Sequence, residues 1–216
     1  NGLSISALSK AFQVLDEERY LKAAMRAANF ARTKLYDEKN GKLMRRYRDG
    51  ETAIEGFSCD YAFLIQGLLD LYEACFDMTY LEWAIELQER QNELFWDKDG
   101  GAYFRSSGGD KNITLRMKDA YDGAEPSANS ISAMNLLRIS QMTDNHDFRE
   151  LAEKTLEFFS EDLQDVPEAY PQLLAALNFY LSEAKQIVIA GIPDAPDTIA
   201  ILREIRTRYL PNKTIL

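Results

Sequence analysis

The sequence predicts a mostly α-helical protein, built as helical hairpins of an (α/α) toroid with a small strand–helix–strand appendage at its end. Three observations predict this fold. The chain repeats itself about every 60 residues, each repeat has the pattern of two helices, and β-branched residues become frequent after residue 184. We expect two units, the helical hairpins over 1–184 and an α/β appendage over 185–216 that packs on them.

The repeat keeps one register over most of the chain. An offset of 60 residues places Tyr20 over Tyr80 and aligns 35–37 (LYD) with 95–97 (FWD). A third copy begins 68 residues further on, near Asn129. Matches of this length in one register predict a repeat architecture in which neighbouring copies bury a shared core.

Each copy is predicted to form two helices, the first mostly buried and the second amphipathic with a solvated outer side. We expect the pairs at 2–16 and 17–36, at 58–76 and 79–96, and at 127–142 and 146–163, with a further helix at 167–183. Turns at 37–41 and 97–101 are each followed by an alternating segment, which indicates a short hairpin. Armadillo-like solenoids are the alternative, but their repeats are nearer about 40–47 residues.

The last part of the chain changes character. A β-branched run predicts a strand over 186–191, helical spacing of apolar residues predicts a helix over 194–209, and 214–216 fits a second strand. A unit of this size cannot bury a core alone, so it is expected to pack on the helical body.

Composition excludes several classes of function. The chain has 25 Lys and Arg against 35 Asp and Glu, a net charge of -10, which argues against nucleic acid or anionic membrane as a main partner. No apolar run approaches the roughly 18 residues needed to span a bilayer. A single histidine, His146, excludes a multi-histidine metal site within this chain, and we expect neither a metal nor a cofactor.

Cysteine usage says little about the compartment. Two cysteines, Cys59 and Cys75, exclude a zinc ribbon and a disulfide scaffold, and both are expected to be small core residues. Cys59 falls near a predicted helix start, where the helix dipole lowers a thiol pKa. Two unpaired thiols suit a reducing compartment, cytoplasmic or mitochondrial, whereas Asn1 in place of Met leaves a targeting segment and secretion open.

Several strings resemble a known family. They are 122–130 (DGAEPSANS), 60–63 (DYAF), 94–97 (LFWD), 101–104 (GAYF) and 185–189 (KQIVI). Together they are similar to the spermatogenesis-associated protein 20 family, and the resemblance covers essentially all 216 residues.

The resemblance implies a much longer protein, in which a thioredoxin-like domain precedes a six-hairpin toroid related to glycosidases and N-acylglucosamine epimerases. This chain would be the C-terminal portion, a partial toroid with about three of the six hairpins, and the remainder of the polypeptide would be its partner. The family is associated with spermatogenesis and fertility. Because Cys59 and Cys75 lie sixteen residues apart, no Cys-x-x-Cys redox motif transfers to this chain.

Toroids of this type line one end of their central cavity with the N-termini of the inner helices, and carboxylates gather there in this sequence. Glycoside hydrolysis needs two carboxyl groups, one as acid and one as base or nucleophile. The candidate catalytic residues are Asp60, Asp122 and Glu125, and the candidate residues for a saccharide or small polar ligand are Glu55, Phe57, Tyr61, Asp119 and Tyr121. The alternative is that Asp60, Ser58 and Ser127 cap helices.

Two functions therefore stay open at this point. The first is a scaffold or ligand-binding part of a thioredoxin-fused protein, and the second is a carbohydrate-active domain. Within the second, glycosidase-like chemistry is favoured, because the epimerases rely on histidines and His146 falls in a predicted turn before an outer helix. A basic cluster at Lys42, Arg45, Arg46 and Arg48 is expected to be an exposed hairpin and not a nucleic-acid site.

Overall fold

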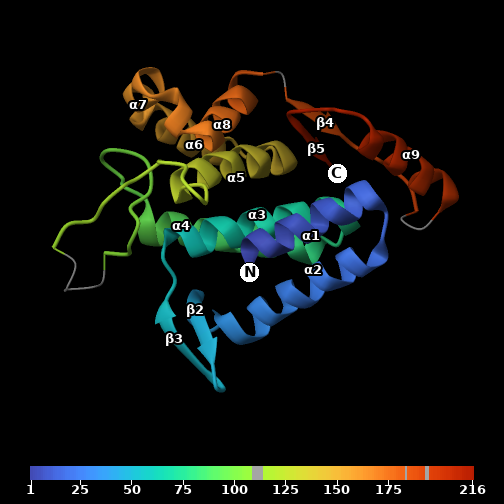
Figure 1. Ribbon diagram of the computed structural model, residues 1–216, viewed down its shortest axis with the longest axis horizontal. Coiled ribbons are helices and arrows are strands. Elements are labelled where there is room, and N and C mark those ends of the chain that lie inside the picture. The colour runs from blue at the N-terminus through green and yellow to red at the C-terminus, as the bar shows by residue number, and fades with distance from the viewer. Residues whose placement is uncertain (109–113, 183, 193–194) are drawn as a thin grey trace.

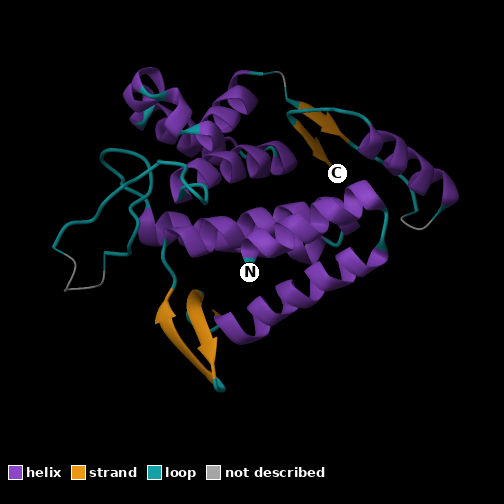
Figure 2. Ribbon diagram, in the orientation of Figure 1, coloured by secondary structure: helices purple, strands orange, loops and turns teal. Residues whose placement is uncertain are grey.

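The computed structural model describes residues 1–108, 114–182, 184–192 and 195–216. Helices dominate these residues, and the strands form two small groups at different corners of the molecule (Figure 2). The helices are α1 (Gly2–Leu15), α2 (Glu18–Phe30), which a π-helical segment (Ala31–Leu35) extends, α3 (Ser58–Cys75), α4 (Met78–Phe95), α5 (Ala128–Thr143), α6 (His146–Phe158), α7 (Ser160–Asp165), α8 (Pro171–Leu181) and α9 (Pro196–Thr207). The strands are β1 (Tyr36–Asp37), β2 (Lys42–Arg48), β3 (Glu51–Glu55), β4 (Lys185–Ile187) and β5 (Lys213–Ile215).

The helices form two layers, as the sequence predicted. The inner helices α1, α3, α5 and α8 pack in succession, and the outer helices α2, α4 and α6 each pack on the inner helix that precedes them in the chain (Figure 1). The core lies between the layers and is filled by residues such as Ile5, Ile65, Leu68 and Leu136, all fully buried. The predicted mostly α, toroid-type fold is confirmed.

The sixty-residue repeat is visible in the backbone. Each inner helix of the three copies ends at a left-handed residue, Asp16 with φ 56°, Phe76 with φ 58° and Asp144 with φ 56°. These residues are 60 and 68 positions apart, the two offsets found in the sequence. The left-handed residue reverses the chain direction, so each outer helix folds back on its inner helix.

The two predicted hairpins differ in the structure. Tyr36 pairs with Leu43, and 60 residues later Trp96 pairs with Tyr103, so both turns close in the same register. The first grows into the sheet β1–β2–β3. The second is a short hairpin of one bridge, closed by the N–H of Asp97 donating to Ala102 at 3.0 Å and the N–H of Phe104 donating to Phe95 at 2.9 Å. The backbone N–H of Tyr103 faces away from Trp96 and donates to Asn129 Oδ1 at 2.7 Å, which joins this hairpin to the first turn of α5.

Two glycines allow α1 and α3 to approach closely. A Cβ placed on Gly67 would lie 2.6 Å from the carbonyl oxygen of Gly2, and one on Gly2 would lie 2.2 Å from that of Phe63. No side chain larger than hydrogen fits at either position without moving the helices apart. The crossing therefore depends on glycine in both helices.

The third copy departs from one long outer helix. The helix expected over 146–163 is interrupted at Phe159, where the backbone takes φ −99° and ψ 14°, so that α6 and α7 are separate. The helix expected over 167–183 starts as a 3-10 turn over Pro167–Ala169 before α8 begins at Pro171, and residue 183 lies outside the described residues.

The appendage is a strand–helix–strand unit, as expected. β4 and β5 pair in parallel with Lys185 opposite Lys213, and α9 connects them. β4 is shorter than predicted and α9 begins at Pro196, while Asp194, the predicted start of the helix, lies outside the described residues. The unit meets the body where β5 contacts α5 and α9 contacts α1 (Figure 1). Within the described residues, no helix has the length and apolarity needed to cross a bilayer.

Candidate functional site

Asp60 lies in the first turn of α3, where it serves the helix itself. Its Oδ2 accepts the backbone N–H of Phe57 at 2.8 Å. The same oxygen lies 3.7 Å from the guanidinium of Arg45, which also stands over the Phe57 ring at 5.0 Å from its centroid. The carboxylate is thus engaged by a backbone donor and a cation, and Phe57 is half-buried beneath that cation.

Asp122 is fully occupied by backbone donors. Its Oδ1 accepts the N–H of Ser127 at 2.8 Å, at the start of α5. Its Oδ2 accepts the N–H of Gln172 at 2.8 Å and that of Leu173 at 3.2 Å, in the first turn of α8. One carboxylate therefore joins the N-termini of two inner helices, where the helix dipoles favour a negative charge.

Asp119, Tyr121 and Glu125 come together around a cleft of about 270 Å³ beside the start of α5. All three side chains are exposed, and Arg105 and Cys59 line the same cleft. The loop is held because Asn129 Nδ2 donates to the carbonyl oxygens of Asp119 at 2.8 Å and Tyr103 at 3.0 Å. The cleft thus offers two carboxylates, a guanidinium and an aromatic ring on a fixed loop.

A second cleft of about 190 Å³ lies next to it and is lined by Arg45, Asp60 and also Glu125. Glu125 therefore stands between the two clefts, and Asp122 lines neither of them. Of the three candidate catalytic residues, the structure brings Asp60 and Glu125 to one cleft and leaves Asp122 to hold the helices.

Two of the candidate binding residues lie away from these clefts. The Tyr61 ring is 1% exposed, packs against Phe95 with ring centroids 5.5 Å apart, and its hydroxyl accepts the N–H of Leu43 at 2.9 Å. This ring has no face free to stack on a ligand. Glu55 ends β3 at the surface and pairs with Lys42 at 2.5 Å, which is the exposed basic hairpin that the sequence predicted.

The surroundings of the two thiols raise the pKa of both on balance. Burial, followed by the neighbouring carboxylate of Asp60, raises the pKa of Cys59 above its ordinary value. Burial likewise raises the pKa of Cys75. The expected lowering at Cys59 by the helix start is therefore outweighed by desolvation. Among the residues that the structure describes, no three His, Cys, Asp or Glu side chains are grouped as metal ligands.

A buried charge cluster on the inner helices escaped the sequence interpretation. Asp70 of α3 is 1% exposed and lies 3.0 Å from the Lys10 ammonium of α1 and 2.9 Å from the Arg138 guanidinium of α5. Arg138 also donates to Glu73 at 3.0 Å, and the hydroxyl of Ser6 donates to Asp70 Oδ2 at 2.6 Å. The cluster ties three inner helices together by charge.

The electrostatics of the cluster are balanced. Burial acts to raise the pKa of Asp70, but the cations Arg138 and Lys10 outweigh it and hold that pKa below its ordinary value. Burial acts to lower the pKa of Arg138, and the two carboxylates hold it above its ordinary value. Both groups are therefore charged, and the cluster carries no unbalanced group for acid–base chemistry. In the sequence, Asp70 and Glu73 are two acidic residues within an otherwise apolar helix. Nothing in that pattern indicates that they share Arg138 as a partner.

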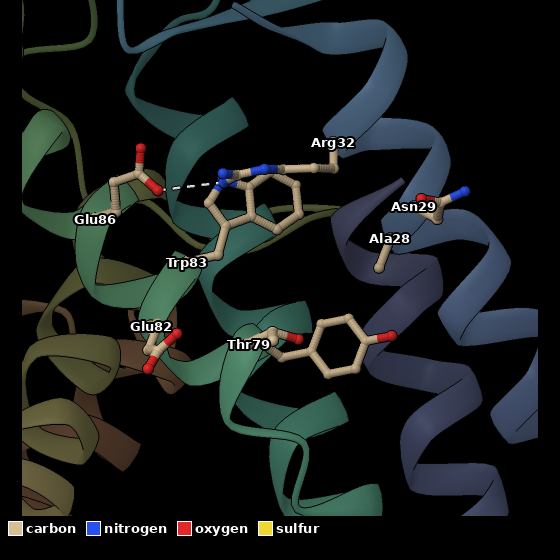
Figure 3. A pocket seen from close by; sticks show the side chains of 8 residues that line it. Ala28, Asn29, Arg32, Thr79, Glu82, Trp83 and Glu86 are labelled. Carbon is tan, nitrogen blue, oxygen red and sulfur yellow. Dashed lines mark hydrogen bonds and ion pairs between the residues drawn. The ribbon is translucent and has the colours of Figure 1, made fainter. Parts of the chain in front are cut away.

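A third cleft, of about 430 Å³, lies between the outer helices α2 and α4. Its wall is a stack in which the Arg32 guanidinium lies 4.9 Å from the Trp83 ring centroid and donates to Glu86 at 3.2 Å (Figure 3). Tyr36 donates to the other oxygen of Glu86 at 2.5 Å. These polar side chains are paired with one another across the cleft wall. In the sequence they only show the pattern of an amphipathic helix, so the cleft was not predicted.

Comparison with known proteins identifies relatives over the full chain. The chain is 42% identical to spermatogenesis-associated protein 20 of Rattus norvegicus and 41% identical to that of Homo sapiens, and both matches cover all of this chain. The chain belongs to the spermatogenesis-associated protein 20 family. It spans 28% of the length of the rat relative and 29% of the human one, so the expected portion of a longer family protein is confirmed. No family model matches the chain.

Solved structures with the same fold come from carbohydrate enzymes. A GH76 α-mannanase of Bacteroides thetaiotaomicron superposes with a TM-score of 0.60 at 18% identity, over 74% of this chain and 43% of the mannanase. A cellobiose 2-epimerase of Bacillus thermoamylovorans gives a TM-score of 0.60 at 15% identity, over 73% of this chain and 42% of the epimerase. Identities this low show a shared toroid fold for the spermatogenesis-associated protein 20 segment and not a shared activity.

Proposed function

We propose that this chain is a non-catalytic scaffold within its longer family protein. The observation that carries the proposal is the use of the carboxylates at the inner-helix N-termini. Both carboxylate oxygens of Asp122 accept backbone N–H groups at the starts of α5 and α8, and the carboxylate of Asp60 accepts the N–H of Phe57. A hydrolytic pair needs one carboxyl group free to give a proton and another free to receive one. Residues that act as helix caps serve stability instead.

The scaffold is proposed to dock on the remainder of the same polypeptide through α1. Among the inner helices, α3 lies between α1 and α5, and α5 lies between α3 and α8, whereas α1 has only α3 beside it in the described residues. The outward side of α1, called here the α1 face, carries exposed or half-buried side chains, namely Leu3, Ser4, Ala7, Lys10, Ala11 and Val14. Large apolar and small side chains with a single charge suit packing against another helix.

The proposed remainder is large, because the family proteins extend far beyond the matched segment. The resemblance to the family implies that it includes a thioredoxin-like domain. In this proposal the 216 residues carry no redox group of their own and hold the rest of the molecule in place.

A second candidate function is the binding of a saccharide at the cleft formed by Asp119, Tyr121, Glu125 and Arg105. It is favoured by one observation, that these side chains are grouped around a common cleft on a loop held by Asn129. Carboxylates and an arginine supply hydrogen bonds to hydroxyl groups, and a tyrosine ring supplies a stacking surface.

One experiment separates the two candidates. A full-length family protein is tested for binding and hydrolysis of a panel of glycans by calorimetry and product analysis, together with its Glu125→Gln and Tyr121→Ala variants. The scaffold proposal expects no hydrolysis by any of the three proteins. Hydrolysis that falls at least about tenfold in Glu125→Gln, with the melting temperature unchanged, contradicts the scaffold, whereas binding without hydrolysis that is lost in Tyr121→Ala supports the saccharide-binding candidate.

A further inference from the structure

The two-stranded sheet of the appendage has one covered edge and one open edge. β4 and β5 pair in parallel, with Lys185 opposite Lys213 and Ile187 opposite Ile215. Parallel strands form slanted, slightly weaker hydrogen bonds, and parallel sheets are almost always larger than two strands and covered. A parallel pair with a free edge is therefore able to accept another strand.

The outer edge of β5 is closed by the helical body. The backbone N–H of Ile215 donates to Glu73 Oε1 at 3.2 Å, and Glu73 itself is held by Arg138 on α5. Thr214 is 0% exposed and Ile215 4% exposed. A third strand has no access on this side.

The inner edge of β4 is used by β5 at every second residue. Lys185 donates to the carbonyl oxygen of Asn212 and Ile189 to that of Leu216, both at 2.8 Å. The carbonyl oxygen of Ile187 accepts the N–H of Leu216 at 2.9 Å. Lys185, Ile187 and Ile189 thus direct their backbone polar groups toward β5.

The alternate residues are Gln186 of β4 and, beyond its end, Val188 and Ala190. They direct their backbone polar groups to the opposite edge, since the same alternation continues to the bond of Ile189 with Leu216. All three are exposed, and Val188 is 68% exposed although its side chain is apolar. The Gln186 side chain donates to the carbonyl oxygen of Gln141 on α5, and Gln141 Nε2 donates to the carbonyl oxygen of Ala184, so α5 closes this edge at its start. From Gln186 onward, no other strand pairs with this edge within the described residues. This open edge of β4 lies on the side of the sheet away from β5 (Figure 1).

We propose that an extended segment of the same polypeptide, from outside these 216 residues, adds to the open edge of β4 as a third strand. The rat and human relatives are long enough to contain such a segment, since this chain spans only 28% and 29% of their lengths. Hydrogen bonds from three edge residues contribute less free energy than a free peptide loses in entropy on binding. A segment tethered to the same polypeptide has a high effective concentration, so the same few bonds are enough to hold it. The added strand carries an apolar side chain beside Val188.

This inference rests on the proposed docking of the remainder of the polypeptide and names a second contact for it. The two contacts involve different elements, because the open edge belongs to β4 and the proposed helix contact belongs to α1. Protection from hydrogen exchange at β4 without an effect of substitutions at α1 would show that only the strand contact exists, and the reverse result would show that only the helix contact exists.

The test is hydrogen exchange with single-residue resolution on a full-length family protein at two concentrations tenfold apart. Ile189, bonded to β5, is the internal standard. The proposal expects the amides of Val188 and Ala190 to exchange at least roughly 100-fold more slowly than in an unfolded peptide, as Ile189 does, at both concentrations. Protected Ile189 with unprotected Val188 and Ala190 overturns the added strand. Protection of Val188 that disappears on dilution identifies a second copy as the occupant and overturns the tethered segment.

Discussion

At the level of single residues, Asp122 is the side chain whose role differs most between the two functional hypotheses. It accepts three backbone N–H groups from the starts of two inner helices, and Glu125, three positions later, is exposed beside two clefts. The two carboxylates come from one short string of the sequence. Only one of them is committed to the fold, so they form a matched pair for substitution.

We expect Asp122→Asn to lower the free energy of unfolding by about 1–3 kcal/mol, because an amide has one acceptor oxygen where the carboxylate uses two. Glu125→Gln is the control and is expected to change stability by less than about 0.5 kcal/mol. Urea unfolding followed by circular dichroism measures both. Equal stability of the two variants would show that Asp122 is not a structural cap.

Some of these roles were predictable from sequence and others were not. Ser127 was predicted as a cap, and its hydroxyl accepts the N–H of Ser130 at 3.0 Å, because a cap is a local contact of a few residues. The contact of Asp122 with Gln172 spans 50 residues and depends on how α5 packs on α8. The burial of Tyr61 depends in the same way on the sheet that folds over it.

At the level of elements, the fold depends on the close crossing of α1 and α3. We expect Gly67→Ala to destabilise the chain by about 1–3 kcal/mol, because the new Cβ meets the Gly2 carbonyl oxygen at 2.6 Å and the resulting strain exceeds the gain in helix propensity of about 1 kcal/mol. The control is Gly108→Ala, whose Cβ meets, among the residues that the structure describes, only the flexible Arg116 side chain at 3.6 Å. Thermal unfolding compares the two, and a Gly67→Ala variant as stable as the control contradicts the crossing.

The buried cluster makes the joint between α1, α3 and α5 sensitive to acid. The pKa of Asp70 is lowered in the folded chain, so its contribution to stability is complete above its unfolded pKa of about 3.9 and is lost as the pH falls below that value. We expect Asp70→Asn to cost about 3 kcal/mol at pH 7, because it removes one partner of a buried ion pair, and to lose less stability than the parent between pH 4 and pH 2. Urea unfolding across this pH range measures both effects. A variant with the same acid sensitivity as the parent would contradict the assignment to Asp70.

Elements that are marked by local sequence signals agree with their predicted bounds, whereas elements whose form depends on packing against distant residues differ from the prediction. In the first two copies, α1, α3 and α4 start and end within about two residues of their predicted bounds, because apolar spacing and turn residues mark them directly. The α-helix α2 ends at Phe30, and only its π-helical extension brings it to Leu35, close to the predicted end at residue 36. The second hairpin stays at one bridge, and its contact with α5 through Tyr103 and Asn129 spans 26 residues of the sequence. The break at Phe159 has no sequence signal that we can identify.

At the level of the whole molecule, the repeat accounts for the layered arrangement and for the face that it leaves open. Copies at offsets of 60 and 68 residues place one inner helix beside the next, and the left-handed residues Asp16, Phe76 and Asp144 turn the chain at equivalent points. The same logic leaves the α1 face without an inner-helix neighbour in the described residues. The proposed scaffold role therefore requires that the α1 face be covered in a full-length family protein.

Calorimetric unfolding of a full-length family protein tests this most directly, with Val14→Asp on the α1 face compared with Ile201→Asp on α9. Val14 is 75% exposed and Ile201 50% exposed in this chain, so neither substitution disturbs its own core. If α1 docks on the remainder of the polypeptide, Val14→Asp buries a charge and lowers the melting temperature of the transition in which these helices unfold. The expected shift is several degrees, roughly 2–4 °C per kcal/mol lost for a unit of this size, while Ile201→Asp leaves it within about 1 °C. Equal and negligible shifts in both variants would show that the α1 face is open to water, and would contradict the scaffold.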